Sequence, residues 1–220
     1  MNSTTKLFQV SSFNFQLNHL VIIGVLILAF STSFLIRSQP AEYGFELNEF
    51  DPFFNFRATE HVVEYGFDSY FNWVDKLSWY GSGTGDPLNG GIASGRDVSS
   101  TSQIGLHLTA ATTYWIFGGG TDLYDYTILF PVVIGSLTVI VIFGLVRLFA
   151  GTTAGLFASM FFAVSVAIIS RGMIGWFKSE PLGIFYGSSG LYLFFSAIKS
   201  ENKKIAISKI VFGAIILGLG

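Results

Sequence analysis

Long runs of apolar residues alternate with shorter polar segments along most of the chain. A helix needs roughly 20 mostly apolar residues to cross a bilayer, with about 17 as the lower limit. Four runs meet that limit, at 20–36, 126–149, 152–169 and 182–198, and a fifth begins at residue 205. This pattern predicts an all-α polytopic membrane protein.

The first run, 20–36, is interpreted as a retained span. It begins too far into the chain for a signal peptide, and no small-residue cleavage site follows it cleanly. The runs at 126–149 and 152–169 are separated only by the dipeptide AG, so we expect them to form a tight helical hairpin. The fifth run reaches Gly220 without a cap or flanking charge, which predicts that the chain continues beyond it.

The segment 102–117, with the sequence SQIGLHLTAATTYWIF, is apolar but short. It contains Gln103, His107 and several threonines, which are unusual in a lipid-facing span. We expect it to form an interfacial or re-entrant helix rather than a crossing.

Basic residues in short loops predict the orientation, because such loops face the cytoplasm. Lys199, Lys203 and Lys204 follow the fourth run, and Arg147 lies at the expected hairpin. The expected organisation is a cytoplasmic N-terminus (1–19), a first span (20–36), external loop 1 (37–125) with the interfacial helix (102–117), a second and a third span (126–149 and 152–169), external loop 2 (170–181), a fourth span (182–198) and the start of a fifth (205–220).

Composition narrows the possible functions. The chain is 51% hydrophobic and 12% charged, with a mean hydropathy of +0.58. The net charge of −2 provides no broad basic surface, which argues against a nucleic-acid partner. Cysteine is absent, so disulfides and thiolate metal sites are excluded within this sequence.

Acidic residues gather in the expected external loops. Asp51 lies in the first loop and Glu180 in the second, so the topology places both on one membrane face. Carboxylates from separate loops can hold a hard divalent ion, and such an ion can neutralise a leaving diphosphate. By spacing alone, ordinary hydrated loop charge is the favoured interpretation. Asp51 also suits the N-cap of a helix near 55–65, with Pro52 in its first turn.

The run EFDPFFNFRAT at 49–59 resembles the first-loop motif of the catalytic subunit of the archaeal and eukaryotic oligosaccharyltransferases. FNWVDKLSWY at 71–80 is similar to the continuation of that motif, and SR at 170–171 to the start of the second-loop motif. The resemblance covers roughly residues 15 to 200. It implies the polyprenol-dependent membrane glycosyltransferase fold, in which this chain would form the N-terminal helices with a large external first loop.

The resemblance implies en bloc transfer of an oligosaccharide from a polyprenyl (dolichyl) phosphate or diphosphate donor to asparagine of an Asn-x-Ser/Thr sequence. Asp51 and Glu180 would be the catalytic carboxylates and the ligands of Mn²⁺ or Mg²⁺. The expected partners are the lipid-linked donor, the acceptor polypeptide and the bilayer. The active face would be extracytoplasmic, at the cell membrane of a prokaryote or the endoplasmic reticulum of a eukaryote, and this portion alone would be inactive.

The sequence departs from the family at Lys178, where members usually have aspartate. Three interpretations stay open: the ammonium replaces part of the metal's charge, a metal binds through Asp51, Glu180 and a later loop, or the chain is a non-catalytic relative. The first two are favoured because the Asp51 motif is intact. Other candidates for donor or phosphate contact are Arg96, Arg171, Arg57 and Glu49; of these, Arg57 is expected mainly to pair with Glu49 or a helix C-terminus.

Two other functions remain as alternatives. One is a related transferase that moves mannose from a polyprenyl phosphate to protein hydroxyls, and the other is a non-catalytic scaffold of a membrane complex. His107 and His61 are expected to be packed or exposed, because no second histidine lies at ligand spacing.

Overall fold

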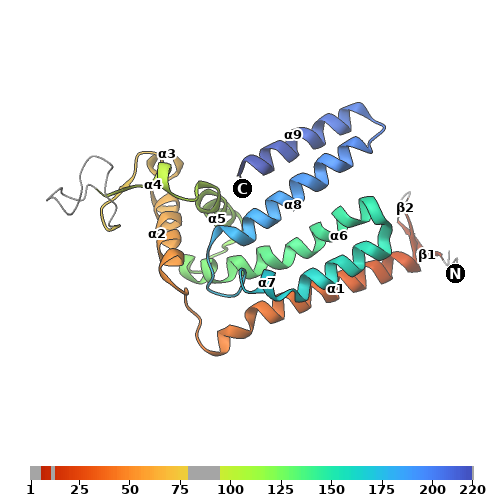
Figure 1. Cartoon of the computed structure of the whole chain (residues 1–220), viewed down its shortest axis with the longest axis horizontal. Coiled ribbons are helices and arrows are strands. Elements are labelled where there is room, and N and C mark those ends of the chain that lie inside the picture. Colours follow the sequence, from red (N-terminus) through yellow and green to blue (C-terminus); the bar gives the residue numbers. More distant parts are fainter. Residues whose placement is uncertain (1–5, 11–12, 79–94, 220) are drawn as a thin grey trace. The chain divides into compact units, whose positions relative to one another are not determined.

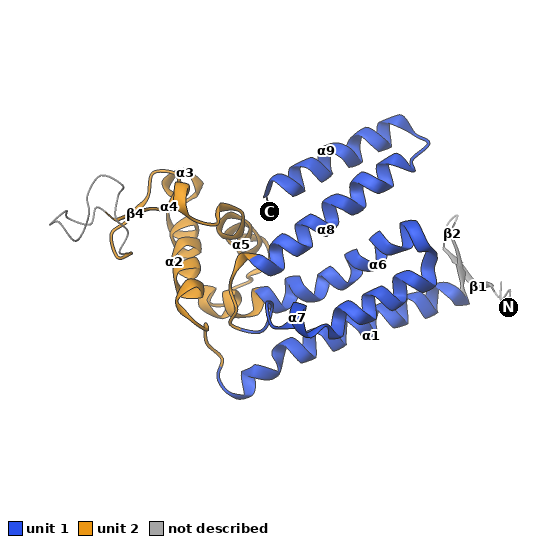
Figure 2. Cartoon of the chain, viewed as in Figure 1, with its two compact units in different colours: residues 1–44, 131–174, 180–220 blue, residues 45–130, 175–179 orange. Residues whose placement is uncertain are grey.

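The computed structural model describes residues 6–10, 13–78 and 95–219, which form two compact units (Figure 2). Unit 1 contains residues 1–44, 131–174 and 180–220, and unit 2 contains residues 45–130 and 175–179. The glycine-rich segment 80–94 lies outside the described residues.

Unit 1 holds the long apolar helices (Figure 1). Its helices are α1 (Leu17–Ser38), the short 3-10 helix η1 (Gln39–Glu42), most of α6 (Leu123–Val164), α7 (Val166–Ile169), nearly all of α8 (Ser179–Ile198) and α9 (Lys203–Leu219). Before α1, strands β1 (Lys6–Val10) and β2 (Phe13–Gln16) pair antiparallel. The sequence pattern did not predict this short hairpin.

Three of the described helical segments are long and apolar enough to cross a membrane: Leu17–Glu42, Leu123–Val164 and Ser179–Ile198. The second contains all of the run 126–149 and most of the run 152–169, the two runs expected to form a hairpin. At Gly151 the backbone leaves helical geometry, with φ 83° and ψ 177°, and the ribbon of α6 doubles back there (Figure 1). Glycine suits this position because a side chain disfavours positive φ.

Small residues bring the helices of unit 1 together. Ala29 of α1 is fully buried against Val139 and Ala163 from the two halves of α6. A Cβ at Gly190 of α8 would lie 2.4 Å from the side chain of Leu217 in α9. Close approach through glycine and alanine is typical of helices in membranes, where dispersion contacts replace the hydrophobic effect as the main attraction.

Unit 2 is built on two helices, α2 (Phe50–Tyr65) and α5 (Ile104–Phe117). Its smaller elements are α3 (Phe67–Tyr70), the paired strands β3 (Val74–Asp75) and β4 (Arg96–Asp97), α4 (Val98–Thr101) and the first turns of α6. Its core consists of Ala58, Val62, Tyr70, Val98 and Ala111. The helix expected over 102–117 is therefore present, as α5, and packs on α2; its position in the membrane interface stays a prediction.

Candidate functional site

The first-loop acids lie at the N-terminus of α2. The helix begins at Phe50, so Glu49 occupies the N-cap position and Asp51 lies in the first turn. The interpretation of Asp51 as the N-cap is therefore wrong. A carboxylate in the first turn is favoured by the helix dipole, and it remains free to contact other groups.

Glu49 has an unusual backbone conformation. Its φ of 70° and ψ of 178° lie in a region that is essentially restricted to glycine, and among the described residues other than glycine it is the only one with positive φ. Such a conformation costs on the order of 1–3 kcal/mol, and it persists where surrounding contacts impose it.

The segment from Gly175 to Lys178 is fastened to the residues just before α2. The amide of Asn48 donates to the carbonyl of Gly175 at 3.0 Å, and the amide of Gly175 donates to the carbonyl of Ile128 at 3.0 Å. Gly175 has φ 76°, and a Cβ there would lie 2.2 Å from the carbonyl oxygen of Glu46. Only glycine allows the two segments to approach so closely.

This attachment brings Lys178 between the two first-loop acids. Its Nζ lies 2.9 Å from Oε2 of Glu49 and 3.1 Å from Oδ2 of Asp51, and 4.3 Å from the ring centre of Trp176. The Lys178 side chain is only 12% exposed, whereas that of Asp51 is 75% exposed. We call Glu49, Asp51 and Lys178 the lysine–carboxylate cluster.

The cluster keeps Lys178 charged. Partial burial lowers the pKa of this lysine, but the hydrogen bonds and the negative charges of Glu49 and Asp51 outweigh it, so the pKa lies above its ordinary value. The three formal charges add to −1. Among the described residues, Oδ1 of Asp51 has no protein partner, so this exposed oxygen can accept a hydrogen bond from a ligand.

A buried hydrogen-bond network fixes the residue before Lys178. Nδ2 of Asn55 donates to the carbonyl of Phe177 at 2.9 Å, and Oδ1 of Asn55 lies 3.0 Å from Nε2 of His107. Nδ1 of His107 in turn lies 2.7 Å from the hydroxyl of Tyr70. Asn55 can satisfy both partners if His107 carries its proton on Nε2 and Tyr70 donates to Nδ1. The network therefore joins α5 and α2 to the segment that carries Lys178.

His107 is fully buried. Burial first, and the positive charge of Arg96 second, lower its pKa to about 3, so the imidazole is neutral at physiological pH. Of the two expected states, packed or exposed, His107 is packed. Its bond to the site-bearing segment was not visible in the sequence.

Two candidate phosphate ligands are engaged within unit 2. Arg57 forms an ion pair with the buried Asp75, so the expected pairing with Glu49 is wrong; Lys178 takes that place instead. Arg96 donates from Nε to the hydroxyl of Thr101 at 3.0 Å and lies 3.9 Å from the ring centre of Phe54. Both arginines therefore support the fold around α2.

Unit 1 contains the candidate residues Arg171 and Glu180. Nη1 of Arg171 lies 3.7 Å from Oε1 of Glu180, a loose ion pair with both side chains partly exposed. Near them in unit 1, Arg37 is fully buried and donates to the hydroxyl of Ser33 at 2.6 Å. A buried arginine at the end of a span was not singled out from the sequence, because charge at a helix end is usually read as a loop residue.

The two expected metal ligands belong to different units. Asp51 belongs to unit 2 and Glu180 to unit 1, so neither unit contains both expected ligands. Within 6–10, 13–78 and 95–219, no three His, Asp or Glu side chains come together in a group that could hold an ion. Beside Asp51 the nearest cation is the ammonium of Lys178.

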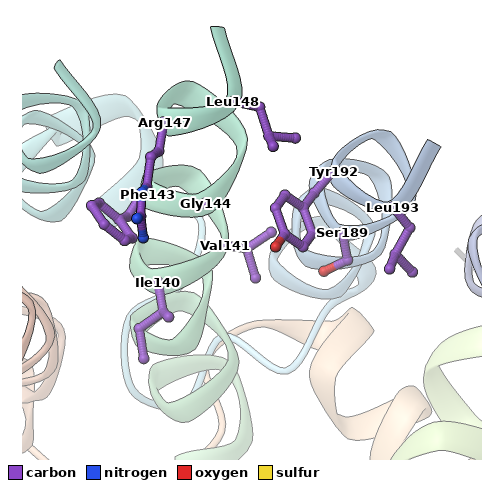
Figure 3. Close-up of a pocket in the computed structure, with 9 residues that line it drawn as sticks. All are labelled: Ile140, Val141, Phe143, Gly144, Arg147, Leu148, Ser189, Tyr192 and Leu193. Atoms are coloured by element: carbon purple, nitrogen blue, oxygen red, sulfur yellow. The ribbon is translucent and has the colours of Figure 1, made fainter. Parts of the chain in front are cut away.

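An apolar hollow of about 750 Å³ lies between α6 and α8 in unit 1 (Figure 3). Its lining includes Phe143, Gly144, Tyr192 and Leu193, with Arg147 shortly before the break in α6 at Gly151. None of the candidate residues lines it. It therefore adds nothing to the polar chemistry of the two loops.

Comparison with known proteins identifies the family of this chain. The family described as "Oligosaccharyl transferase STT3, N-terminal" matches residues 20–220. The chain is 33% identical over 207 residues to the dolichyl-diphosphooligosaccharide–protein glycosyltransferase subunit stt-3 of Caenorhabditis elegans, covering 92% of this chain and 26% of the relative. It is 30% identical over 191 residues to subunit STT3 of Dictyostelium discoideum, covering 86% and 24%.

Solved structures show the same fold. The chain is similar to the archaeal oligosaccharyltransferase AglB of Archaeoglobus fulgidus, described in complex with an inhibitory peptide and a dolichol-phosphate, with a TM-score of 0.69 and 17% identity over 92% of this chain and 23% of that one. A second structure of that oligosaccharyltransferase, described in complex with Zn and sulfate, matches with a TM-score of 0.66, over 89% and 24%. The chain thus spans about a quarter of the length of these proteins.

Proposed function

Because the chain belongs to the oligosaccharyl transferase STT3 N-terminal family, we propose that its full-length protein transfers an oligosaccharide in N-glycosylation. The donor is a polyprenyl (dolichyl) phosphate or diphosphate, and the acceptor is the asparagine of an Asn-x-Ser/Thr sequence in a polypeptide. The names of the curated relatives and the peptide and dolichol-phosphate of the archaeal structure support these partners. The protein is an integral membrane protein, and we place the reaction at its extracytoplasmic face.

The observation that carries this proposal is the exposed carboxylate of Asp51, held at one oxygen by Lys178. An asparagine amide nitrogen is a weak nucleophile because its lone pair is delocalised into the carbonyl. The free oxygen of Asp51 can accept a hydrogen bond from that amide, orient its nitrogen and receive the proton that the nitrogen loses. The bond from the anomeric carbon to the donor phosphate breaks as the carbon–nitrogen bond forms, and the phosphate leaves with the electron pair.

A divalent metal is part of the reaction that the family resemblance implies. Mn²⁺ or Mg²⁺ at Asp51 and Glu180 would stabilise the charge of the departing phosphate. The described residues around Asp51 do not fit such an ion, because the cation on this carboxylate is the ammonium of Lys178 and no group of three His, Asp or Glu side chains includes it. The roles assigned to Asp51 above therefore do not depend on a metal.

The test is Asp51→Ala in the full-length protein, assayed with a lipid-linked oligosaccharide and an Asn-x-Thr peptide. Loss of the group that orients the amide should lower the rate on the order of 10³-fold, about 4 kcal/mol of barrier. Asp68→Ala is the matched control, because this exposed acid of unit 2 lies outside the cluster. A variant at position 51 that keeps a rate close to wild type, with normal expression, would refute the role of Asp51.

The proposed membrane face has its own test. Single cysteines replace Ser100 in the first loop and Ser200 after α8, in a full-length protein without other cysteines. An impermeant thiol reagent added to intact cells, or to sealed vesicles in which the extracytoplasmic face is outside, should label position 100 and not position 200. The reverse labelling pattern would overturn the orientation while leaving the transfer reaction itself untouched.

A further inference from the structure

The cation beside Asp51 in this protein is an ammonium. We propose that Lys178 takes the place of a divalent metal at the first-loop carboxylates, so that Asp51 works without a metal bound to it. This inference rests on the proposed transfer reaction, and it changes what the site requires for that reaction.

The geometry leaves no separate place for a metal on the oxygen that faces Lys178. The ammonium lies 3.1 Å from Oδ2 of Asp51, the expected metal ligand of the first loop, and 2.9 Å from Oε2 of Glu49. A Mg²⁺ ion would have to approach an oxygen to about 2.0–2.1 Å, beside a positive charge. A metal on Oδ2 would therefore require the ammonium to leave that oxygen.

Several contacts keep the ammonium in place. The backbone of its segment is bonded to Asn48 and Asn55, and the face of Trp176 lies 4.3 Å from Nζ. The side chain is 12% exposed, so little room remains for it to swing into solvent. The unfavourable backbone of Glu49 is also consistent with a contact that aims this carboxylate at Lys178.

The bound ammonium gives Asp51 a defined role. With Oδ2 on Lys178, the carboxylate cannot turn freely, and Oδ1 is presented to the acceptor amide. The positive charge also reduces the repulsion between two neighbouring carboxylates and the anionic phosphate of the donor. Lys178 is thus a positioning residue for Asp51 and the local counter-charge, two tasks that a metal could otherwise perform.

The experiment measures transfer and Mn²⁺ binding in parallel on the full-length protein. The wild type should transfer in excess EDTA at the rate it shows with Mn²⁺, and electron paramagnetic resonance should detect no Mn²⁺ site that depends on Asp51. Lys178→Met should lower the rate on the order of 10²-fold at every Mn²⁺ concentration. Lys178→Asp should acquire a Mn²⁺ site and transfer only when the metal is present. Lys178→Arg, which keeps the charge, should stay independent of metal.

Lys76→Met is the matched control, because this lysine of unit 2 is exposed and lies outside the cluster. Its metal titration should superimpose on that of the wild type. A wild-type rate that EDTA abolishes and Mn²⁺ restores would overturn the inference while the proposed function stands. A wild-type protein that transfers under no condition would instead refute the proposed function. In that case the Mn²⁺ binding measurement still tests the role of Lys178. If the wild type binds Mn²⁺ and Asp51→Ala does not, the role is overturned. If the wild type shows no Mn²⁺ binding that depends on Asp51, the role is supported.

Discussion

Replacing Asn55 by leucine tests whether the buried network holds the segment that carries Lys178. The change keeps the approximate volume of the side chain but removes both of its hydrogen bonds. The carbonyl of Phe177 and Nε2 of His107 would then lose their partners, and both residues are fully buried. Each unsatisfied buried group costs about 1–3 kcal/mol, so Asn55→Leu should destabilise this part of unit 2 by roughly 2–6 kcal/mol.

Native-state hydrogen exchange of the full-length protein measures this cost locally. Amides of the segment 175–179 should exchange at least roughly 30-fold faster, the factor that corresponds to about 2 kcal/mol. Asn72→Leu is the control: its side chain bonds the carbonyl of Asp68 at the surface, so its effect should stay within about 0.5 kcal/mol. Unchanged protection of 175–179 in Asn55→Leu would refute the idea that the network positions Lys178.

Two further predictions concern the same unit. Gly175→Ala should cost several kcal/mol in thermal unfolding, because a Cβ would lie 2.2 Å from the carbonyl oxygen of Glu46. Gly66→Ala, at φ 84° but in open space, should cost only the backbone strain of about 1–3 kcal/mol; equal effects would contradict the close approach. The pKa of His107 is lowered to about 3 in the folded protein, so its contribution to stability is complete above its ordinary pKa of 6.5 and is lost as the pH falls toward 3. Melting at pH 7 and pH 4.5 should differ by up to about 2–3 kcal/mol from this group, and the His107→Gln variant should lack that part of the difference.

The sequence predicted the local features of the site well. The apolar runs indicated the long helices of unit 1, because helix length in a bilayer depends on consecutive composition. The residues around Asp51 form a helix near the expected place. The helix begins at Phe50, so Asp51 lies in its first turn and is not the N-cap. Recognition of the motif at 49–59 also indicated which carboxylate to examine.

The pairings across long stretches of sequence could not be predicted in the same way. Lys178 contacts Glu49 across 129 positions, and Asn55 binds the carbonyl of Phe177 across 122. Arg57 was expected to pair with Glu49 but pairs with Asp75. Both acids are near it in sequence, and only the β3–β4 pair brings Asp75 into reach. Charge type and spacing constrain such partners weakly, since the backbone path between them decides which groups meet.

The break at Gly151 also bears on how the protein enters the membrane. The part of α6 from residue 152 to Val164 rises only about 20 Å at 1.5 Å per residue, less than the roughly 30 Å of a hydrocarbon core. A single non-helical residue joins this part to the longer first half, so no separate loop lies between the two. During synthesis the two halves are therefore expected to enter the bilayer together, and insertion of the short second half would depend on that of the longer first half. The segments that carry Glu180 and Lys178 would reach the far side only after that joint insertion.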